Sequence, residues 1–406
     1  MTEAMLCARN SDPDVAPGLL DRLGQQPSDP LLALIGAYRG DPRPEKIDVG
    51  VGVYRDLDGA TPVLRAVKEA ERRLVATQAS KGYLGPEGDI GFFELLKPIL
   101  FGDAVPEDRL SGLQTPGGTG ALRLAADLVA TAQQGARVLA GDPTWANHAP
   151  ILKAARLETV GYRHFDVSRQ ALTFDRLAEA LDNARPGDVA LLHGCCHNPT
   201  GADLDPDQWK RVATLLRDRG VLPLIDLAYQ GLGSGLAADA TGVRIVLEQV
   251  DEALITYSCD KNFGLYRERT GALFAVSRDA AAAAVTQSNL LALARANWSM
   301  PPDHGAAIVR TILEDDDLTA DWRLELEAMR ARLVAIRALL AAADPALSAL
   351  AGQRGLFSTL PLSPDQVREL REVHAIYMPS SGRINVAGLT PATAPRFVAA
   401  LQAVRR

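Results

Sequence analysis

The chain has 406 residues, of which 47% are hydrophobic and 23% charged. This composition is typical of a globular enzyme with two domains and excludes disordered and coiled-coil classes. The formal net charge is -7 and no block of Lys or Arg occurs, so we expect neither nucleic acid nor a membrane surface as a partner.

The cysteines have neither metal-ligand nor disulfide spacing, and they are Cys7, Cys195, Cys196 and Cys259. We therefore expect no metal site and a reducing compartment. The first twenty residues lack an apolar signal-peptide core, and no apolar run of about 18 residues follows. These features predict a cytoplasmic protein.

Short apolar runs alternate with helical patterns through the middle of the chain. The runs lie around Val138 and at residues 189–192, 221–225, 253–255 and 272–276. Such alternation predicts an α/β fold with a mostly parallel central sheet covered by helices.

Two helices stand out in this pattern. Residues 205–219 predict one helix, which Gly220 ends. Residues 322–343 predict a longer helix, because apolar side chains recur every three or four residues. We expect the longer helix to lead from a large domain to a small one. The predicted division is 1–58 for an N-terminal arm and part of the small domain, 59–320 for the large domain, and 321–406 for the linking helix and the rest of the small domain.

Polar side chains follow three of the predicted strands. Asn198 comes after the first, Asp226 and Tyr229 after the second, and Ser258, Lys261 and Arg269 after the third. Ligands of parallel sheets bind at the carboxyl ends of strands, so we expect these residues at one edge.

This set of residues fits one cofactor chemistry. Lys261 is a candidate for a Schiff base with an aldehyde cofactor, and Asp226 for the partner of its ring nitrogen. Tyr229 and Asn198 are candidates to hydrogen-bond the ring's 3-oxygen. Trp145 follows another strand and could stack on a flat ring.

A cradle for a phosphate precedes a third helical pattern. Gly117, Gly118, Thr119 and Gly120 stand directly before it, and backbone N–H groups at a helix N-terminus bind anions. Arg269 and Ser258 could complete the cradle.

Taken singly, each of these residues also has an ordinary structural explanation. A lone lysine after a strand is usually on the surface, and a lone Asp226 would be equally suited to capping a helix. His148 and His197 could make structural hydrogen bonds or support Asp226. Only the combination of these residues indicates a catalytic site.

Taken together, the motifs resemble those of the aspartate/aromatic aminotransferases, which are class I, fold type I pyridoxal-phosphate enzymes. The resemblance runs from about Asp29 to the C-terminus. It includes KIDVGVGVYRD, KGYLG, QTPGGTGALR, DPTWANH, HGCCHNPTGADLDPDQW, IDLAYQG, SCDKNFGLYRERTGAL, RANWSMPPDHGA and SGRINVAGL.

The resemblance implies a cofactor, pyridoxal 5'-phosphate, and a role for each matched residue. Lys261 would hold the cofactor and shuttle the proton of the reaction, and Asp226, Tyr229, Asn198 and Trp145 would bind the ring. Gly118, Thr119, Ser258 and Arg269 would bind the phosphate. The family's fold also has a smaller α+β domain.

Substrate-binding residues and a second subunit are implied in the same way. Arg383, with Gly52 and Asn198 beside it, would bind the substrate α-carboxylate. Arg295 of a partner subunit would bind the distal carboxylate of aspartate or glutamate, and Tyr83 of the partner would reach the phosphate. The expected assembly is a homodimer with shared active sites.

The expected reaction is a ping-pong transamination between an amino acid and a 2-oxo acid such as 2-oxoglutarate. Aspartate and aromatic donors remain equally open. Two alternatives are a cofactor-sensing regulator, which would need a DNA-binding module, and a decarboxylase or β-lyase of the same fold. About 28 residues precede the first family-like segment, too few for such a module, and the pair Arg295 and Arg383 favours a transaminase over the other enzymes.

One residue departs from the family pattern. Asp260 precedes Lys261 where a small residue is expected. A carboxylate facing the phosphate at about 5 Å would cost roughly 3 kcal/mol per pair of unit charges at an effective dielectric near 20. Alternatively, Asp260 turns away to cap backbone N–H groups or to pair with Arg267 or Arg269, and this second arrangement is favoured.

Overall fold

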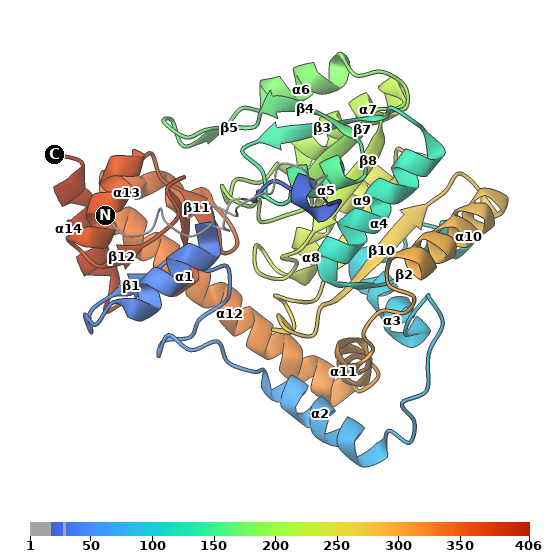
Figure 1. Ribbon diagram of the computed structural model, residues 1–406, viewed down its shortest axis with the longest axis horizontal. Helices are drawn as coiled ribbons and strands as arrows, with labels where there is room; N and C mark the ends of the chain where they lie inside the picture. Colours follow the sequence, from blue (N-terminus) through green and yellow to red (C-terminus); the bar gives the residue numbers. More distant parts are fainter. Residues whose placement is uncertain (1–17, 27–29) are drawn as a thin grey trace.

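The computed structural model describes residues 18–26 and 30–406, so Cys7 lies outside the described residues. A large sheet covered by helices forms one body, and a smaller group of elements from both ends of the chain forms another, with α12 (Asp316–Ala343) running between them (Figure 1). In the described part of the chain, no helix is long and apolar enough to cross a membrane.

The large sheet has seven strands in the order β2-β10-β9-β8-β7-β3-β4. Their bounds are β2 (Leu110–Pro116), β3 (Arg137–Asp142), β4 (Glu158–Arg163), β7 (Val189–His193), β8 (Leu222–Leu227), β9 (Ala253–Ser258) and β10 (Thr270–Val276). Strand β10 is antiparallel to both neighbours and every other pairing is parallel. The prediction of a mostly parallel sheet is confirmed.

Alternate residues of the strands fill two separate cores. Leu191 and Leu224 pack under α4 (Gly117–Ala132), α5 (His148–Ala154) and α10 (Ala280–Asn297). Leu192 and Ile225 point to the other face, which α7 (Pro206–Arg219) and α9 (Thr241–Leu247) cover. Because both faces are buried, these strands read as continuous apolar runs.

The helix predicted at 205–219 is α7. Asp205 caps it by accepting hydrogen bonds from Asp207 N and Gln208 N, and the Gln208 side chain closes the capping box. Gly220 ends it with φ +63°, a left-handed conformation that favours glycine.

The predicted long helix is α12, but it begins at Asp316 and not at Trp322. Asp315 caps its first turn by accepting from Leu318 N at 2.9 Å. The first turn is acidic and lacks the apolar repeat from which the start was inferred, so periodicity alone placed the start too late.

The smaller body joins the two ends of the chain. Strand β1 (Ile47–Asp48) pairs in parallel with β12 (Ile376–Tyr377), and β11 (Phe357–Thr359) pairs antiparallel with β13 (Arg383–Asn385). Helices α1 (Pro30–Gly40), α13 (Pro364–Glu372) and α14 (Ala394–Val404) lie around them (Figure 1). The domain division at residues 58 and 320 stays a prediction.

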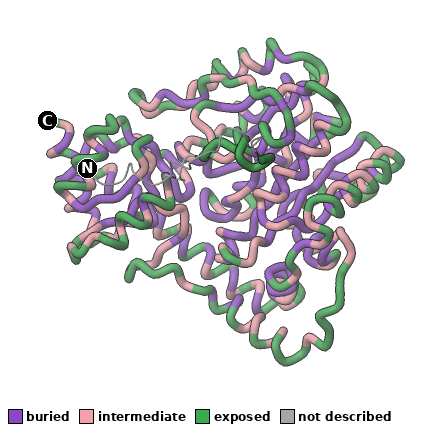
Figure 2. The backbone as a smooth tube through the Cα atoms, viewed as in Figure 1, coloured by how far each residue is buried: buried purple, intermediate pink, exposed green. Residues whose placement is uncertain are grey.

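The remaining elements connect or cover these two bodies. They are η1 (Leu20–Arg22), α2 (Arg65–Thr77), α3 (Ile90–Leu100), η2 (Glu107–Arg109), β5 (Phe165–Asp166), β6 (Ala171–Leu172), α6 (Phe174–Asp182), α8 (Leu236–Asp239), α11 (His304–Leu313), η3 (Pro345–Gly352) and η4 (Val386–Gly388). Strands of the large sheet are mostly buried, whereas the segment between α2 and α3 is largely exposed (Figure 2).

Candidate active site

A cleft of about 340 Å³ opens at the carboxyl ends of β7, β8 and β9. Asp226 lies in β8, Ser258 ends β9, and Lys261 follows three residues later. The other proposed site residues that line the cleft are Gly52, Gly118, Thr119, Trp145, Asn198, Tyr229, Arg269 and Arg383. Of the residues to which the family resemblance gave a role, only Tyr83 and Arg295 do not line it.

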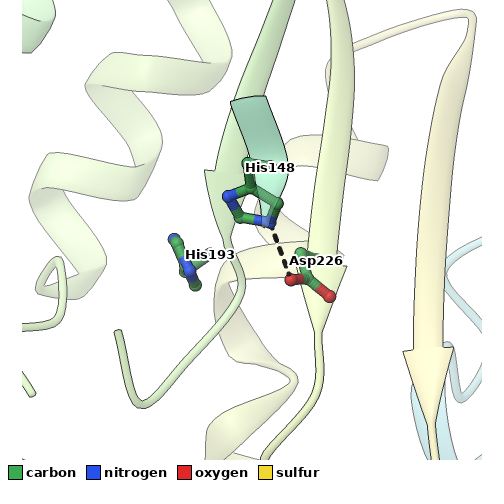
Figure 3. Close-up of side chains that lie close together, drawn as sticks. All are labelled: His148, His193 and Asp226. Atoms are coloured by element: carbon green, nitrogen blue, oxygen red, sulfur yellow. Dashed lines mark hydrogen bonds and ion pairs between the residues drawn. The ribbon is translucent and has the colours of Figure 1, made fainter. Parts of the chain in front are cut away.

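Asp226 is buried and held by two hydrogen bonds. His148 Nε2 lies 3.2 Å from Asp226 Oδ2 (Figure 3). Thr256 Oγ1 donates to Asp226 Oδ1 at 3.1 Å. Burial alone would raise the pKa of Asp226, but the hydrogen bond with His148 and the neighbouring charges outweigh it and lower that pKa. Asp226 is therefore a carboxylate suited to hold a proton on a cationic ring nitrogen.

A column of histidines extends away from Asp226. His193 lies beside His148 (Figure 3), the ring of His197 packs on His193 at 4.1 Å between centroids, and His164 stacks on His197 at 4.0 Å. Burial lowers the pKa of His193 to about 3 and that of His164 to about 4. Neutral rings thus lie behind the carboxylate.

The structure distinguishes the roles of His148 and His197, which the sequence left open. His148 contacts Asp226 directly, whereas His197 Nδ1 is 2.8 Å from Thr200 Oγ1. The nitrogen or oxygen ligand atoms of His148, His193 and Asp226 lie within 4.8 Å of one another, a spacing that could also suit a metal ion. The direct contact between His148 and Asp226, at 3.2 Å, already gives two of these three side chains a partner.

Lys261 projects from the segment after β9 into the cleft. Its Nζ lies 5.2 Å from the centre of the Tyr229 ring. Burial lowers the pKa of the Lys261 amine, and the charges of Asp260 and Asp226 oppose that shift. A lowered pKa increases the share of neutral amine, the form that acts as a nucleophile or base.

Asn198 and Tyr229 form a polar pair near the lysine. Asn198 Nδ2 donates to Tyr229 Oη at 3.3 Å, and Asn198 Oδ1 is buried without a partner among the described residues. Burial raises the pKa of Tyr229. A bound polar group in the cleft would satisfy these side chains.

The first turn of α4 meets Arg269 and Ser258. A Cβ on Gly117 would lie 2.6 Å from Arg269 Nη2, and one on Gly118 would lie 3.1 Å from Ser258 Cβ. Only glycine fits at Gly117, which also has φ +68°. A helix N-terminus, a hydroxyl and a guanidinium therefore converge, as a phosphate group requires.

Asp260 pairs with Arg269, whose Nη1 donates a short hydrogen bond to Asp260 Oδ2. Asp260 is buried and also lines the cleft. The expected pairing with a nearby arginine is confirmed, whereas the expected turn away from the site is not, because Asp260 lines the cleft.

Arg383 also lines the cleft. Its Nη2 donates to Gly50 O at 2.9 Å, and its guanidinium lies 4.6 Å from the centre of the Phe357 ring. Burial lowers the pKa of Arg383. A Cβ on Gly52 would lie 2.9 Å from Phe357 Cζ, so the chain needs glycine there.

Tyr83 and Arg295 lie outside the cleft of this chain. The side chain of Tyr83 is 97% exposed, and Arg295 is exposed on the last turn of α10, where it donates to Ser299 Oγ. Their assignment to a partner's active site stays a prediction.

Sequence reasoning missed two aromatic residues of the cleft. Phe357 carries no polar group and lies far along the chain from Lys261, so no pattern marked it. Tyr266 stands within the quoted SCDKNFGLYRERTGAL segment, and its hydroxyl accepts from Tyr54 N at 2.8 Å. Its place between two site residues, Lys261 and Arg269, was the available signal.

Comparisons with known proteins agree with this geometry. A tyrosine aminotransferase of Rhizobium meliloti (strain 1021) is 54% identical over 380 residues, which are 93% of this chain and 97% of the relative. An aspartate aminotransferase of Escherichia coli is 42% identical over 92% of this chain and 96% of the relative.

Solved structures agree as well. The aromatic-amino-acid aminotransferase of Burkholderia pseudomallei, covalently bound to pyridoxal phosphate, superposes with a TM-score of 0.93 and 38% identity. The match covers 96% of this chain and 100% of that chain. The model of the family "Aminotransferase class I and II" matches residues 44–401. The chain therefore belongs to the class I and II aminotransferases.

Proposed function

We propose that the chain catalyses pyridoxal-phosphate-dependent transamination between an aspartate or aromatic amino acid and a 2-oxo acid such as 2-oxoglutarate. The observation that carries this proposal is the convergence of Lys261, Asp226 and Arg383 on one cleft. An amine, a carboxylate and a guanidinium match the three groups that must be held, which are an aldehyde, a ring nitrogen and an α-carboxylate.

When bound, pyridoxal phosphate supplies an electron sink for negative charge that develops at the substrate Cα. Asp226, fixed by His148, would keep the proton on the ring nitrogen. Asn198 and Tyr229 would hold the 3-oxygen, and Trp145 would stack on the ring. Because Asp226 already has Thr256 as a second donor, its orientation does not depend on the cofactor.

Lys261 is the residue that would hold the cofactor aldehyde through Nζ, and its amine would move the proton between the substrate Cα and cofactor C4′. The lowered pKa of Lys261 favours the neutral amine that both tasks need. Gly118, Thr119, Ser258 and Arg269 would hold the phosphate of the cofactor.

Arg383 binds the substrate α-carboxylate, with Gly52 and Asn198 beside it. The Phe357 ring fixes the guanidinium plane, and the Gly50 carbonyl holds one Nη. A fixed plane favours two-pronged recognition of a carboxylate.

We further propose a cytoplasmic homodimer with ping-pong kinetics. In the dimer, Arg295 of one subunit faces the substrate side chain in the other, and Tyr83 reaches the phosphate of the other. The exposure of both side chains supports this arrangement. The free, buried cysteines Cys195, Cys196 and Cys259 suit a reducing compartment.

Steady-state rates test the proposed function. Aspartate, phenylalanine and tyrosine are offered in turn with 2-oxoglutarate, and formation of glutamate is measured. We expect turnover with both donor classes, because relatives of both kinds match nearly the whole chain. Absence of glutamate with all three donors would contradict the proposal.

A further inference from the structure

Asp260 is a buried acid in the part of the cleft that faces the phosphate-binding residues. It is 3% exposed and immediately precedes Lys261. Its Oδ2 accepts from Arg269 Nη1 and lies 3.9 Å from Lys261 Nζ. Its Oδ1 is buried and has no hydrogen-bond partner among the described residues.

Arg269 lies between this carboxylate and the first turn of α4. Nη1 faces Asp260, while Nη2 approaches Gly117 so closely that a Cβ there would lie 2.6 Å away. The Arg269 side chain is 41% exposed, against 5% for that of Asp260. One end of the guanidinium is thus neutralised and the other faces the helix N-terminus.

The charged residues that line the cleft leave little net positive charge to bind a phosphate. The basic residues of its lining are Lys261, Arg269 and Arg383, and the acidic ones are Asp226 and Asp260. In the proposed function, Lys261 binds the aldehyde, Asp226 the ring nitrogen and Arg383 the substrate. Arg269 and Asp260 remain, and together they carry no net charge, whereas a phosphate monoester carries about -1.5 to -2 at pH 7.

We propose that Asp260 is the resident counter-anion of Arg269 in the cofactor-free protein, and that the cofactor phosphate competes with it. Asp260 therefore stabilises the cofactor-free state and weakens retention of the phosphate. This inference rests on the proposed function, since it takes the cleft to be the cofactor site.

Competition outweighs any benefit of Asp260 in orienting Arg269. Nη1 also donates to Tyr266 O at 3.2 Å, so the guanidinium keeps one fixed contact when the carboxylate is removed. A second anion on the same guanidinium repels the phosphate, and water screens this repulsion little at the Asp260 carboxylate, whose side chain is 5% exposed.

The experiment compares Asp260→Ser and Asp260→Asn with the wild type. Dissociation constants for pyridoxamine phosphate, which is held without a covalent bond, are measured on cofactor-free protein by fluorescence titration. Both variants should bind at least about tenfold more tightly, equivalent to about 1.4 kcal/mol. The melting temperature of each cofactor-free variant should fall below that of the wild type.

Asp188→Asn is a matched control. Asp188 is 4% exposed and pairs with Arg137 at the start of β3. This pair lies at the amino end of the strand, whereas the cleft lies at the carboxyl ends. Its loss should lower the melting temperature equally with and without cofactor and leave the dissociation constant unchanged. Pyridoxal, which lacks the phosphate, should bind the wild type and the Asp260 variants equally.

Unchanged or weaker pyridoxamine phosphate binding in both Asp260 variants would overturn the inference, because Asp260 would then orient Arg269 for the phosphate. If a cofactor-free variant does not fold, the rate of cofactor loss from the holoenzyme decides, and it should be slower than in the wild type. A wild type that binds neither pyridoxal phosphate nor pyridoxamine phosphate would refute the proposed function instead.

Discussion

Arg383 has few interactions with the protein that would compete for its charge. Its described contacts are the Gly50 carbonyl and the face of Phe357, and its Nε is buried without a partner among the described residues. Burial lowers the pKa of Arg383, which shows that the site disfavours an unpaired cation. An anionic substrate group would relieve this cost.

Arg383→Ala should therefore weaken every amino acid substrate, by about 2–5 kcal/mol in kcat/KM. The measurement is kcat/KM for aspartate and for phenylalanine. Arg332→Ala is the control, because Arg332 stacks on Tyr54 and donates to the Leu389 carbonyl outside the cleft. Equal kinetic losses in the two variants would mean that Arg383 acts only through stability.

Arg295→Ala should discriminate between donor classes. A distal carboxylate needs the Arg295 charge, whereas a phenyl ring does not, so kcat/KM should fall much more for aspartate and 2-oxoglutarate than for phenylalanine. We expect a difference of about tenfold or more, which is about 1.4 kcal/mol. The same loss for both donors would place Arg295 away from the substrate side chain.

Which residues of the cleft could be foreseen depended on their chemistry. The chemical roles of Lys261, Asp226 and Arg383 can be predicted from the residue type and its place in a motif. Phe357 acts through the position of an apolar ring, which only tertiary packing determines. The choice between His148 and His197 as the partner of Asp226 likewise depended on side-chain directions that spacing does not determine.

Whether a strand could be predicted from the sequence depended on how completely its two faces are buried. Strands β7, β8 and β9 were foreseen because both of their faces are covered and their residues are continuously apolar. Strand β4 lies at the edge of the sheet with alternately exposed residues, and β2 is interrupted by Ser, Gly, Gln and Thr, so neither gave an apolar run. The small-domain strands have two or three residues each, too few for any periodicity.

The linking helix α12 is tied to the small domain by Arg337. This side chain is 2% exposed, and its partners are the Ser358 hydroxyl and the carbonyls of Arg354, Gly355 and Phe357. Burial lowers the pKa of Arg337 to about 10. The contact matters for the site because Phe357 supports Arg383.

Arg337→Met should destabilise the fold and disturb substrate binding. Each buried acceptor left without a donor costs about 1–3 kcal/mol, so we expect a loss of about 3 kcal/mol or more in the free energy of unfolding. Denaturant titration measures this loss. The KM for amino acids should rise, because Phe357 would shift. A variant with the same free energy of unfolding as the wild type would contradict this prediction and would mean that water replaces the guanidinium.

At the scale of the whole molecule, the cleft of one chain lacks the two residues assigned to a partner. Tyr83 lies on the segment between α2 and α3, and Arg295 on the last turn of α10, and both are exposed. An exposed tyrosine with 97% of its surface open is unusual for a side chain with a proposed role. Burial against a second subunit would explain it.

Hybrid dimers test this arrangement. Lys261→Ala and Arg295→Ala chains, each poorly active with aspartate, are unfolded, mixed in equal amounts and refolded together. If Arg295 acts across the interface, each hybrid has one intact site, and activity should recover to about a quarter of the wild type, since half of the dimers are hybrid. No recovery would mean that Arg295 serves its own chain or that no dimer forms.

The most direct test of the central claim, that Lys261 binds pyridoxal phosphate for transamination, is the half-reaction followed by absorbance. Wild-type protein loaded with cofactor should show the visible band of lysine-bound pyridoxal phosphate. Phenylalanine or aspartate alone should convert it to pyridoxamine phosphate with one equivalent of 2-oxo acid released, and 2-oxoglutarate should restore the band. Lys261→Ala should show neither the band nor its conversion. A wild-type band that amino acids leave unchanged, or an Ala variant that turns over like the wild type, would contradict the account.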